Sequence, residues 1–150
     1  MKIFIGSDHA GFRLKNELIK SLQQNNGLHT ADITNCGCFS EDSCDYPDIA
    51  RETCLKVLDF GDDALGVLVC GTGAGMSIAA NKIRGIRATA TENTYTARMT
   101  RLHNNANVLC IGARVVGVGL AEDILKAFLS TQFEGGRHSA RVAKLEGADA

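Results

Sequence analysis

The chain has 150 residues, of which 45% are hydrophobic, and this size and composition predict a single compact domain spanning residues 1–150. A formal net charge of −1, from 16 basic and 17 acidic residues, argues against general affinity for nucleic acid or membranes. No apolar run approaches the ~20 residues that span a bilayer, and residues 1–6 are too short for a signal peptide. We therefore expect a cytoplasmic protein whose six cysteines are mostly thiols.

Short apolar segments alternate along the chain with segments of helical periodicity. In chain order we expect a strand at 2–5, a helix at 12–24, a strand at 28–33, a loop at 34–47, a helix at 48–58, a strand at 65–69, a helix at 74–82, a strand at 86–90, a helix at 94–102, a strand at 107–111, a helix at 119–129 and a helical tail after residue 134. This alternation predicts parallel strands joined by helical crossovers, in one sheet with helices on both faces.

One stretch, residues 68–77, places a thiol directly before a glycine-rich turn. Cys70 is followed by Gly71, Gly73 and Gly75, so successive backbone N–H groups can converge on an oxyanion. A helix that starts at residue 74 would favour both a bound anion and a thiolate at Cys70. The alternative is that the glycines only turn a strand into a helix and that Cys70 is a buried apolar residue.

Other polar residues follow the expected strands. Asp8 and His9 come after the first strand and Arg114 after the fifth, and parallel sheets bind ligands at the carboxyl ends of their strands. Asp8 and His9 could equally form a structural hydrogen-bonded pair. Arg137 and Arg141, four residues apart, are either a solvated surface pair or a two-armed clamp on phosphate.

The sequence partly matches two nucleotide-binding motifs but lacks a required residue of each. The spacing from Gly6 to Gly11 resembles a P-loop, but Phe12 and Arg13 stand where Lys and Ser or Thr are required. A dinucleotide fingerprint would need its third glycine one place after Gly75. A non-catalytic nucleotide-binding module, with Glu92 as a ribose-binding acid, stays as an alternative.

A second thiol-bearing segment lies within the expected loop. Cys36, Cys38 and Cys44, with His29 nearby, suggest zinc, but a C-x-C spacing lacks the paired C-x-x-C of zinc sites. We therefore favour ordinary loop thiols, with disulfide exchange among them as a further alternative.

Five motifs in a fixed order resemble those of the type B ribose-5-phosphate isomerases, within the ribose/galactose isomerase superfamily. They are Gly6-Ser7-Asp8-His9-Ala10-Gly11, Asp45-Tyr46-Pro47-Asp48, Cys70-Gly71-Thr72-Gly73 through Ile78-Ala79-Ala80-Asn81-Lys82, Arg101-Leu102-His103-Asn104 and Glu134-Gly135-Gly136-Arg137-His138. The resemblance implies a Rossmann-like three-layer α/β/α sandwich with a five-stranded parallel sheet. It also implies interconversion of ribose 5-phosphate and ribulose 5-phosphate in the non-oxidative pentose phosphate pathway, without metal or organic cofactor.

The resemblance implies a role for each matching residue. Cys70 matches the base that moves a proton through a cis-enediolate, and His103 matches the acid that opens the furanose ring with Asp8. The segment Gly71, Thr72, Gly73, Ala74 and Gly75 matches the loop that holds the developing negative charge, with Thr72 counted as catalytic. His9, Arg114, Arg137 and Arg141 match substrate or phosphate contacts, and Asn104 matches a sugar-hydroxyl contact.

A second version of the family uses Glu as the base at the position of Met76, so this chain resembles the cysteine version. The resemblance further implies a homodimer, or a tetramer, whose active site is shared between subunits. The residues leave open isomerisation of another sugar phosphate, such as galactose 6-phosphate or allose 6-phosphate. The cysteines between Asn35 and Cys44 depart from the family pattern, although no implied role falls there.

Overall fold

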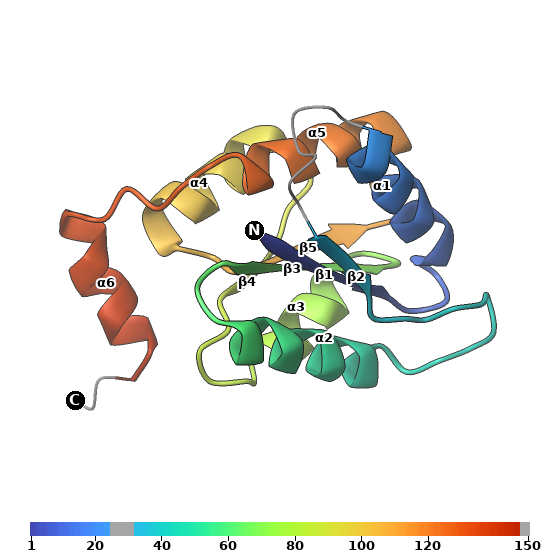
Figure 1. The fold of residues 1–150 in the computed structure, drawn as a ribbon, viewed down its shortest axis with the longest axis horizontal. Helices are drawn as coiled ribbons and strands as arrows, with labels where there is room; N and C mark the ends of the chain where they lie inside the picture. Colours follow the sequence, from blue (N-terminus) through green and yellow to red (C-terminus); the bar gives the residue numbers. More distant parts are fainter. Residues whose placement is uncertain (25–31, 148–150) are drawn as a thin grey trace.

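The computed structural model of the chain describes residues 1–24 and 32–147 (Figure 1). These residues form five strands and six helices in a regular alternation that ends with two helices. In chain order they are β1 (Lys2–Ser7), α1 (Phe12–Gln24), β2 (Asp32–Asn35), α2 (Tyr46–Phe60), β3 (Ala64–Cys70), α3 (Ala74–Ala80), β4 (Ala88–Ala90), α4 (Thr94–Asn104), β5 (Val108–Gly112), α5 (Val118–Leu129) and α6 (Arg137–Leu145).

The strands form one all-parallel sheet in the order β2-β1-β3-β5-β4. The helices α1, α4 and α5 cover one face and α2 and α3 cover the other, which confirms the expected three layers (Figure 1). After β2 the chain crosses to the other side of β1 to form β3, so the strand order reverses between β1 and β3. Ligands of open α/β sheets bind in the crevice at such a point.

The central strand β3 is buried along its entire length, which explains its continuous apolar sequence. Its alternate side chains enter two separate cores, as the pleat requires. Val67 and Val69 pack in the core beneath α1, α4 and α5, whereas Leu68 and Cys70 pack against α2 and α3. Full burial of one aliphatic side chain stabilises the fold by about 1.5–3 kcal/mol. The carboxyl end of β3 is therefore held in place by both cores.

The edge strands and the second helix differ from the expected boundaries. The strand expected at 28–33 is Asp32–Asn35, because its register is set by pairing with β1, where the Lys2 ammonium lies 2.6 Å from Asp32 Oδ2. Residues 28–31 lie outside the described residues. Pro47 does not belong to a loop as expected: it lies in the first turn of α2, where its missing N–H costs no helical hydrogen bond.

Two shorter elements also differ from expectation. The strand expected at 86–90 is reduced to Ala88–Ala90, which pairs only with β5. The helix expected to end at Lys82 ends at Ala80, after which Asn81 brackets the start of β4: its amide donates to Ala88 O at 2.8 Å and accepts from Ala88 N at 2.8 Å. This side-chain bridge joins the end of α3 to the start of β4.

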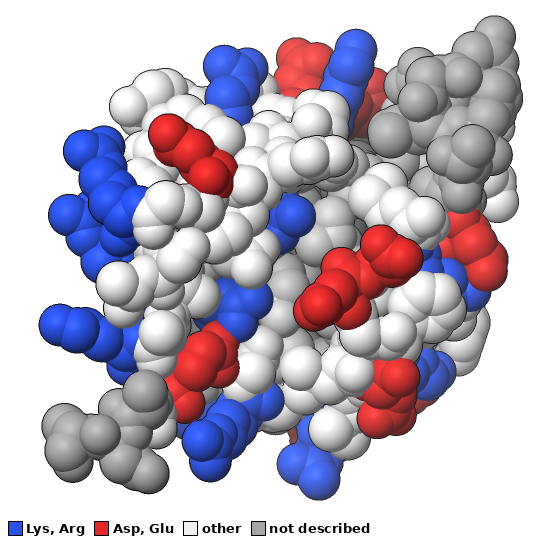
Figure 2. Space-filling view, turned by 60° about the vertical axis from the view of Figure 1, so that its left-hand side comes forward, with Lys and Arg blue, Asp and Glu red and all other residues white. Residues whose placement is uncertain are grey.

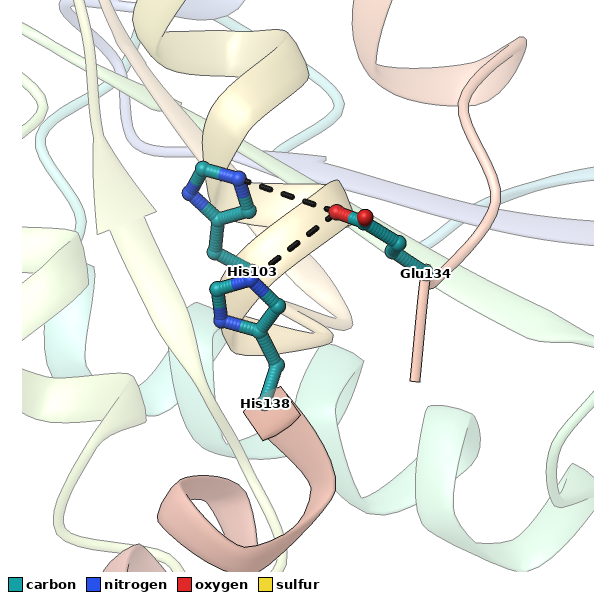
Figure 3. Close-up of side chains that lie close together, drawn as sticks. All are labelled: His103, Glu134 and His138. Atoms are coloured by element: carbon teal, nitrogen blue, oxygen red, sulfur yellow. Dashed lines mark ion pairs between the residues drawn. The ribbon is translucent and has the colours of Figure 1, made fainter. Parts of the chain in front are cut away.

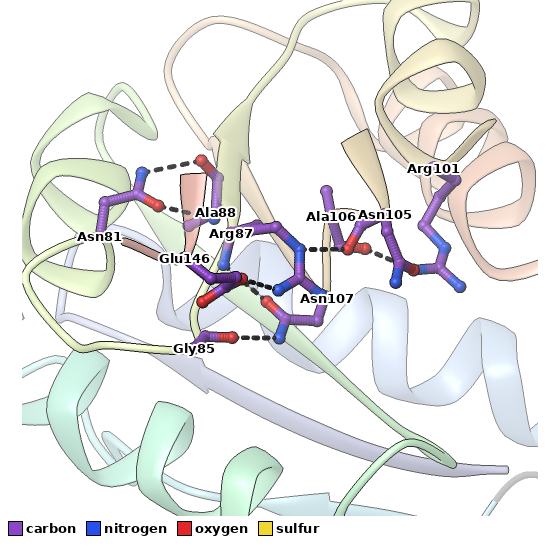
Figure 4. A network of polar contacts seen from close by, with 9 residues as sticks. All are labelled: Asn81, Gly85, Arg87, Ala88, Arg101, Asn105, Ala106, Asn107 and Glu146. Atoms are coloured by element: carbon purple, nitrogen blue, oxygen red, sulfur yellow. Dashed lines mark hydrogen bonds and ion pairs between the residues drawn. The ribbon is translucent and has the colours of Figure 1, made fainter. Parts of the chain in front are cut away.

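The last helix, α6, stands outside the three layers (Figure 1). Beyond its end, Glu146 forms an ion pair with Arg87, whose Nε donates to Asn105 O at 2.8 Å (Figure 4). In the same network Asn107 Oδ1 accepts from Arg87 N at 2.8 Å. A short series of polar contacts thus ties the tail to β4 and to the turn before β5. In the part of the chain that the structure describes, none of the helices has the length and apolar character needed to cross a membrane.

Candidate active site

Three neighbouring strands bring their following segments together at the carboxyl edge of the sheet. Asp8 and His9 follow β1, the loop 71–75 follows β3, and Arg114 lies just beyond β5. We call Asp8, His9, Cys70, the loop 71–75 and Arg114 the carboxyl-edge cluster. The expectation that these residues share one edge is confirmed, and the strand order explains why, because β1, β3 and β5 are consecutive in the sheet.

Cys70 is the last residue of β3 and is only 5% exposed. The backbone N–H of Gly73 donates to Cys70 Sγ at 3.1 Å. Gly73 adopts a φ of 79°, in the left-handed region that favours glycine, so the turn that directs this N–H at the sulfur depends on glycine here. A donor aimed at sulfur is the contact that a thiolate requires, and a proton-abstracting cysteine acts as its thiolate.

The loop after β1 is clamped against the end of β3. Asp8, which is 7% exposed, accepts the N–H of Gly11 on its Oδ1 at 2.9 Å, while its own N–H donates to Val69 O at 3.2 Å. A Cβ atom on Gly11 would lie 2.3 Å from Val69 O, so only glycine allows this approach. The Asp8 carboxyl group is thereby fixed beside the strand that ends in Cys70.

His9 is half-buried and contacts the loop before α2. Its Nδ1 accepts the backbone N–H of Cys44 at 3.4 Å. An acceptor at Nδ1 places the proton of the neutral ring on Nε2, so the outer nitrogen is the one available to donate to a ligand oxygen. The sequence alternative of an Asp8–His9 pair is not adopted, because Asp8 is hydrogen-bonded to Gly11 and His9 to Cys44.

Arg114 and Tyr46 border the glycine-rich loop. The N–H of Arg114 donates to Gly71 O at 3.0 Å, and a Cβ atom on Gly71 would lie 3.6 Å from Arg114 Nη1. A Cβ atom on Gly75 would lie 3.1 Å from the Tyr46 ring. The exposed guanidinium group at this edge can reach an anionic ligand, since it forms directional, charge-assisted hydrogen bonds.

A second group of side chains gathers at the end of α4 and the start of α6. His103, Glu134 and His138, which we call the helix-end cluster, come from three segments of the chain (Figure 3). The two imidazole rings are stacked, with centroids 4.3 Å apart and planes 10° apart. Glu134 Oε2 lies 3.9 Å from His103 Nε2 and 3.8 Å from His138 Nε2. The carboxylate therefore faces both rings from one side (Figure 3).

The helix-end cluster offers three potential metal-ligand atoms within 4.8 Å of one another. An imidazole nitrogen coordinates through a lone pair in the plane of its ring, and two nearly parallel rings direct these lone pairs side by side. They do not converge on one ion. Burial lowers the pKa of His138, and the nearby His103 and Arg137 lower it further, while Glu134 opposes the shift. The lowered pKa favours the neutral form of the His138 ring.

The two clusters lie at opposite edges of the sheet within one chain. The helix α4 follows β4 at the carboxyl edge and leads back to Val108, which pairs with Ala88 at the first position of β4. Its 11 residues span about 16 Å, so His103 in its last turn lies near the amino edge. Asn104, Arg137 and Arg141 lie with it, and all three are exposed.

The face that carries α6 is rich in basic side chains. Arg137 and Arg141 lie on α6 itself, one helical turn apart. Figure 2 turns this side of the molecule forward and shows Lys and Arg side chains gathered along one side of the view, with others in a central hollow. Within one described chain the structure does not bring His103, Arg137 or Arg141 to Cys70. A site that uses both clusters needs two chains.

Three residues that contact the two clusters or belong to them were given no role in the sequence analysis. They are Tyr46, Glu134 and His138. Each belongs to one of the five motifs quoted above, so the sequence already marked these positions as part of the family pattern. What the motifs did not reveal is that Tyr46 covers the glycine loop and that His138 stacks on His103, because both contacts join distant parts of the chain.

A family model described as Ribose/Galactose Isomerase matches residues 3–145. Ribose-5-phosphate isomerase B of Escherichia coli (strain K12) is 45% identical over 141 residues, which cover 94% of this chain and 91% of that protein. D-erythrulose-4-phosphate isomerase of Pectobacterium atrosepticum is 42% identical over 149 residues, which cover 97% of this chain and 93% of that protein.

Solved structures agree along nearly the whole chain. Ribose-5-phosphate isomerase B of Clostridium thermocellum superposes with a TM-score of 0.91 at 45% identity, over 97% of this chain and 95% of that one. Ribose-5-phosphate isomerase B of Mycoplasma genitalium, with bound ribulose-5-phosphate, superposes with a TM-score of 0.90 at 39% identity, over 97% of this chain and 93% of that one. With one family model and these relatives matching from end to end, the chain belongs to the ribose/galactose isomerase family.

Proposed function

We propose that this chain interconverts ribose 5-phosphate and ribulose 5-phosphate, as a cytoplasmic enzyme of the non-oxidative pentose phosphate pathway. One observation carries the proposal: the Cys70 sulfur accepts the N–H of Gly73 at the mouth of a glycine-rich loop, beside Asp8 and Arg114. The relative with bound ribulose-5-phosphate and the relative named ribose-5-phosphate isomerase B support this choice of substrate.

The reaction moves one proton between adjacent carbons. The Cys70 thiolate removes the C2 proton of open-chain ribose 5-phosphate, and the electron pair of that bond forms the C1–C2 double bond of a cis-enediolate. Negative charge develops on oxygen, where the N–H groups of the loop 71–75 can stabilise it. The hydroxyl proton on O2 moves to O1, the Cys70 thiol returns its proton to C1, and the C2–O2 bond becomes the carbonyl of the ketose. A positioned base contributes about 10²- to 10⁴-fold in rate.

The remaining groups of the carboxyl-edge cluster bind and prepare the substrate. Asp8 acts in ring opening, and its carboxyl group is held by Gly11 N–H beside the end of β3. His9, with its outer nitrogen free to donate, and Arg114, with its exposed guanidinium group, contact the phosphate. Thr72 accepts the N–H of Ala74 at 3.4 Å and orders the loop that faces the enediolate.

A second copy of the chain completes the site. Because the helix-end cluster lies at the other edge of the sheet, His103, Asn104, Arg137 and Arg141 of one subunit serve the Cys70 of another in a homodimer or tetramer. His103 acts as the acid of ring opening and Asn104 binds a sugar hydroxyl. The two arginines, one turn apart on α6, hold the phosphate.

The substrate has one alternative with an observation behind it. The relative named D-erythrulose-4-phosphate isomerase is nearly as similar as the one named ribose-5-phosphate isomerase B, so a four-carbon substrate is the second candidate. Galactose 6-phosphate and allose 6-phosphate would be handled by the same proton transfer. The non-catalytic nucleotide-binding module is disfavoured, because it has no need of a thiol that accepts a hydrogen bond from the loop.

Side-by-side turnover on these sugar phosphates tests the proposal. The purified chain is assayed with ribose 5-phosphate, erythrulose 4-phosphate, allose 6-phosphate and galactose 6-phosphate, with and without a chelator, and NAD and ATP binding are titrated in parallel. We expect the highest kcat/KM on ribose 5-phosphate and no effect of the chelator. A higher kcat/KM on any other sugar would reassign the substrate, and micromolar nucleotide binding without turnover would restore the binding-module alternative.

A further inference from the structure

The side chain of Arg87 joins two segments that carry groups of the proposed site. Arg87 directly precedes β4, and 18% of its side chain is exposed. Its Nε donates to Asn105 O at 2.8 Å, and its Nη1 forms an ion pair with Glu146 (Figure 4). A guanidinium group carries donors on all three nitrogens, so it can bridge two acceptors. One side chain thus contacts both the turn after α4 and the residue at the end of α6.

The main chain of Arg87 is itself fixed to the sheet. Its N–H donates to Asn107 Oδ1 at 2.8 Å, and its O accepts the N–H of Asn107 at 3.1 Å. The Asn107 amide also donates to Gly85 O at 2.8 Å, two residues before Arg87 (Figure 4). Arg87 is therefore a fixed point from which the two contacts of its guanidinium group extend.

The turn that Arg87 contacts directly follows the end of α4, where His103 lies. Asn105 ends this helix with a φ of 46°, in the left-handed region that residues other than glycine rarely adopt. Such a conformation costs free energy and persists where the surrounding contacts determine it. Arg101 supplies further contacts, because its Nη1 donates to Ala106 O at 2.5 Å and to Asn105 Oδ1 at 3.3 Å. Two arginines therefore hold the turn, and with it the last turn of α4.

The carboxylate of Glu146 is the counterion of this network. Burial lowers the pKa of Arg101, and the nearby charge of Arg87 lowers it further, so the two cations repel each other. Among the ion pairs of residues 1–24 and 32–147, Arg101 has no carboxylate partner and Arg87 has only Glu146. Loss of this carboxylate would leave two like charges at one turn without a partner, which is unfavourable for partly buried groups.

Glu146 also holds one end of α6. Its ion pair with Arg87 lies at the end of the helix that carries Arg137 and Arg141. In the first turn of the same helix, His138 stacks on an imidazole ring at the end of α4. Because α6 stands outside the three layers (Figure 1), these contacts at its start and its end fix the direction of the helix.

We propose that Arg87 and Glu146 are positioning residues that hold the end of α4 and the end of α6 at a fixed spacing. The first helix carries His103 and the second carries Arg137 and Arg141, so this spacing sets where the proposed acid lies relative to the proposed phosphate ligands. The consequence for catalysis rests on the proposed function. The coupling between the two helix ends does not, because it follows from the contacts of Arg87 alone.

Amide hydrogen exchange tests the coupling without reference to activity. The N–H groups of Asn105 and Ala106 donate to carbonyl groups of α4 at 3.2 and 3.1 Å, so both should be protected from exchange. Exchange into peptides that cover this turn is compared by mass spectrometry in the full chain and in Glu146→Gln, which removes the charge and keeps the size of the side chain. We expect several-fold faster exchange at the turn in Glu146→Gln, although the substituted residue belongs to another segment.

A matched control separates this coupling from the loss of any exposed ion pair. Glu52→Gln removes the ion pair with Lys56 on α2 and should leave exchange at the turn after α4 unchanged. A second variant, Arg87→Met, should speed exchange both at this turn and at the end of α6. Wild-type exchange at the turn in Glu146→Gln, or equal acceleration in Glu52→Gln, would overturn the inference.

Kinetics test whether the spacing matters for the substrate. In Glu146→Gln, KM for ribose 5-phosphate and the inhibition constant of inorganic phosphate should rise by the same several-fold factor, because both depend on how the phosphate ligands are held. A lower thermal midpoint with both constants unchanged would show that the ion pair only stabilises the tail, and would overturn the positioning role. If the chain failed to isomerise sugar phosphates, the proposed function would fall, while the exchange experiment would still decide the coupling.

Discussion

The carboxyl-edge cluster and the helix-end cluster hold polar side chains in different ways. In the first, Cys70 and Asp8 end or directly follow buried central strands and are 5% and 7% exposed, with backbone N–H groups aimed at them. In the second, His103, Glu134 and His138 come from helix ends and a loop, outside the sheet. The proposed base thus lies at the end of a buried central strand, whereas the proposed acid His103 lies at a helix end and the proposed phosphate ligands Arg137 and Arg141 lie on α6. The contribution of each cluster can therefore be tested separately.

Loss of the base should have the largest effect. In Cys70→Ser the hydroxyl is a much poorer proton acceptor than a thiolate, so kcat on ribose 5-phosphate should fall by about 10²- to 10⁴-fold while KM changes little. Steady-state kinetics with a thermal unfolding control measure this. The matched control is Cys110→Ala, which removes a fully buried thiol from the neighbouring strand and should leave kcat near wild type. Near-normal turnover of Cys70→Ser would show that Cys70 is not the base.

Subunit mixing tests whether the two clusters meet across an interface. Cys70→Ala and Arg137→Ala chains should each be inactive alone. Co-refolded heterodimers should recover part of the activity, because one of their two sites combines an intact carboxyl-edge cluster with an intact helix-end cluster. Activity is measured on heterodimers isolated with two affinity tags. Confirmed heterodimers that stay inactive would contradict complementary half-sites.

A pair of glycine substitutions compares the loop after β1, which packs closely against β3, with an open position in α5. The Cβ atom of Gly11→Ala would lie 2.3 Å from Val69 O, so this variant should lose about 1–3 kcal/mol in free energy of unfolding, the usual cost of overpacking. Gly119→Ala, in the first turn of α5 and with nothing within 4 Å of its Cβ, should instead leave the free energy of unfolding unchanged or raise it slightly, because alanine has the higher helix propensity. Denaturant unfolding measures both. Equal effects of the same sign would show that the loop after β1 is not clamped as described.

The smallest effect concerns pH at the helix-end cluster. The folded-state pKa of His138 lies below its unfolded value, so below the usual histidine pKa of about 6.5 the unfolded chain binds more protons. The contribution of the neutral His138 ring to the free energy of unfolding is therefore fully present above the usual histidine pKa of about 6.5 and is lost as the pH falls through the folded-state pKa. Thermal midpoints between pH 7.5 and about 5 should decline less steeply in His138→Phe, which keeps an aromatic ring against His103. The same slope in both proteins would rule out His138 as the titrating group.

The fold could be predicted from sequence where the signal is local and strong. The central strands around Val67 and Leu109 are continuous apolar runs, and their predicted bounds are within one residue of those observed. The edge strands were predicted less well: the strand expected at 86–90 is shorter, and β2 extends to Asn35, beyond the predicted end at residue 33. Both strands are short and partly exposed, so their limits depend on pairing with a neighbour. The order β2-β1-β3-β5-β4 arises from contacts between distant segments, which no local pattern encodes.

The candidate site, like the fold, could be predicted only where the signal is local. Residues adjacent to a strand end, such as Asp8 and Cys70, were correctly placed at the carboxyl edge because a parallel sheet aligns its strand ends. The stack of His103 on His138 and the burial of Lys15 were not foreseen. Both depend on how helices pack. A lysine in an amphipathic helix is normally expected on the solvated side, and only the fold shows that Lys15 turns inward to the cysteine loop.

The surroundings of Met76 determine what a carboxylate base at this position would require. Its side chain is fully buried and packs in the apolar core between β3, α2 and α3. A glutamate introduced here alone would be desolvated and would favour its protonated form, which cannot accept a proton from a sugar. A carboxylate base at position 76 would therefore need water or polar partners around it, whereas the proposed base Cys70 already accepts the N–H of Gly73.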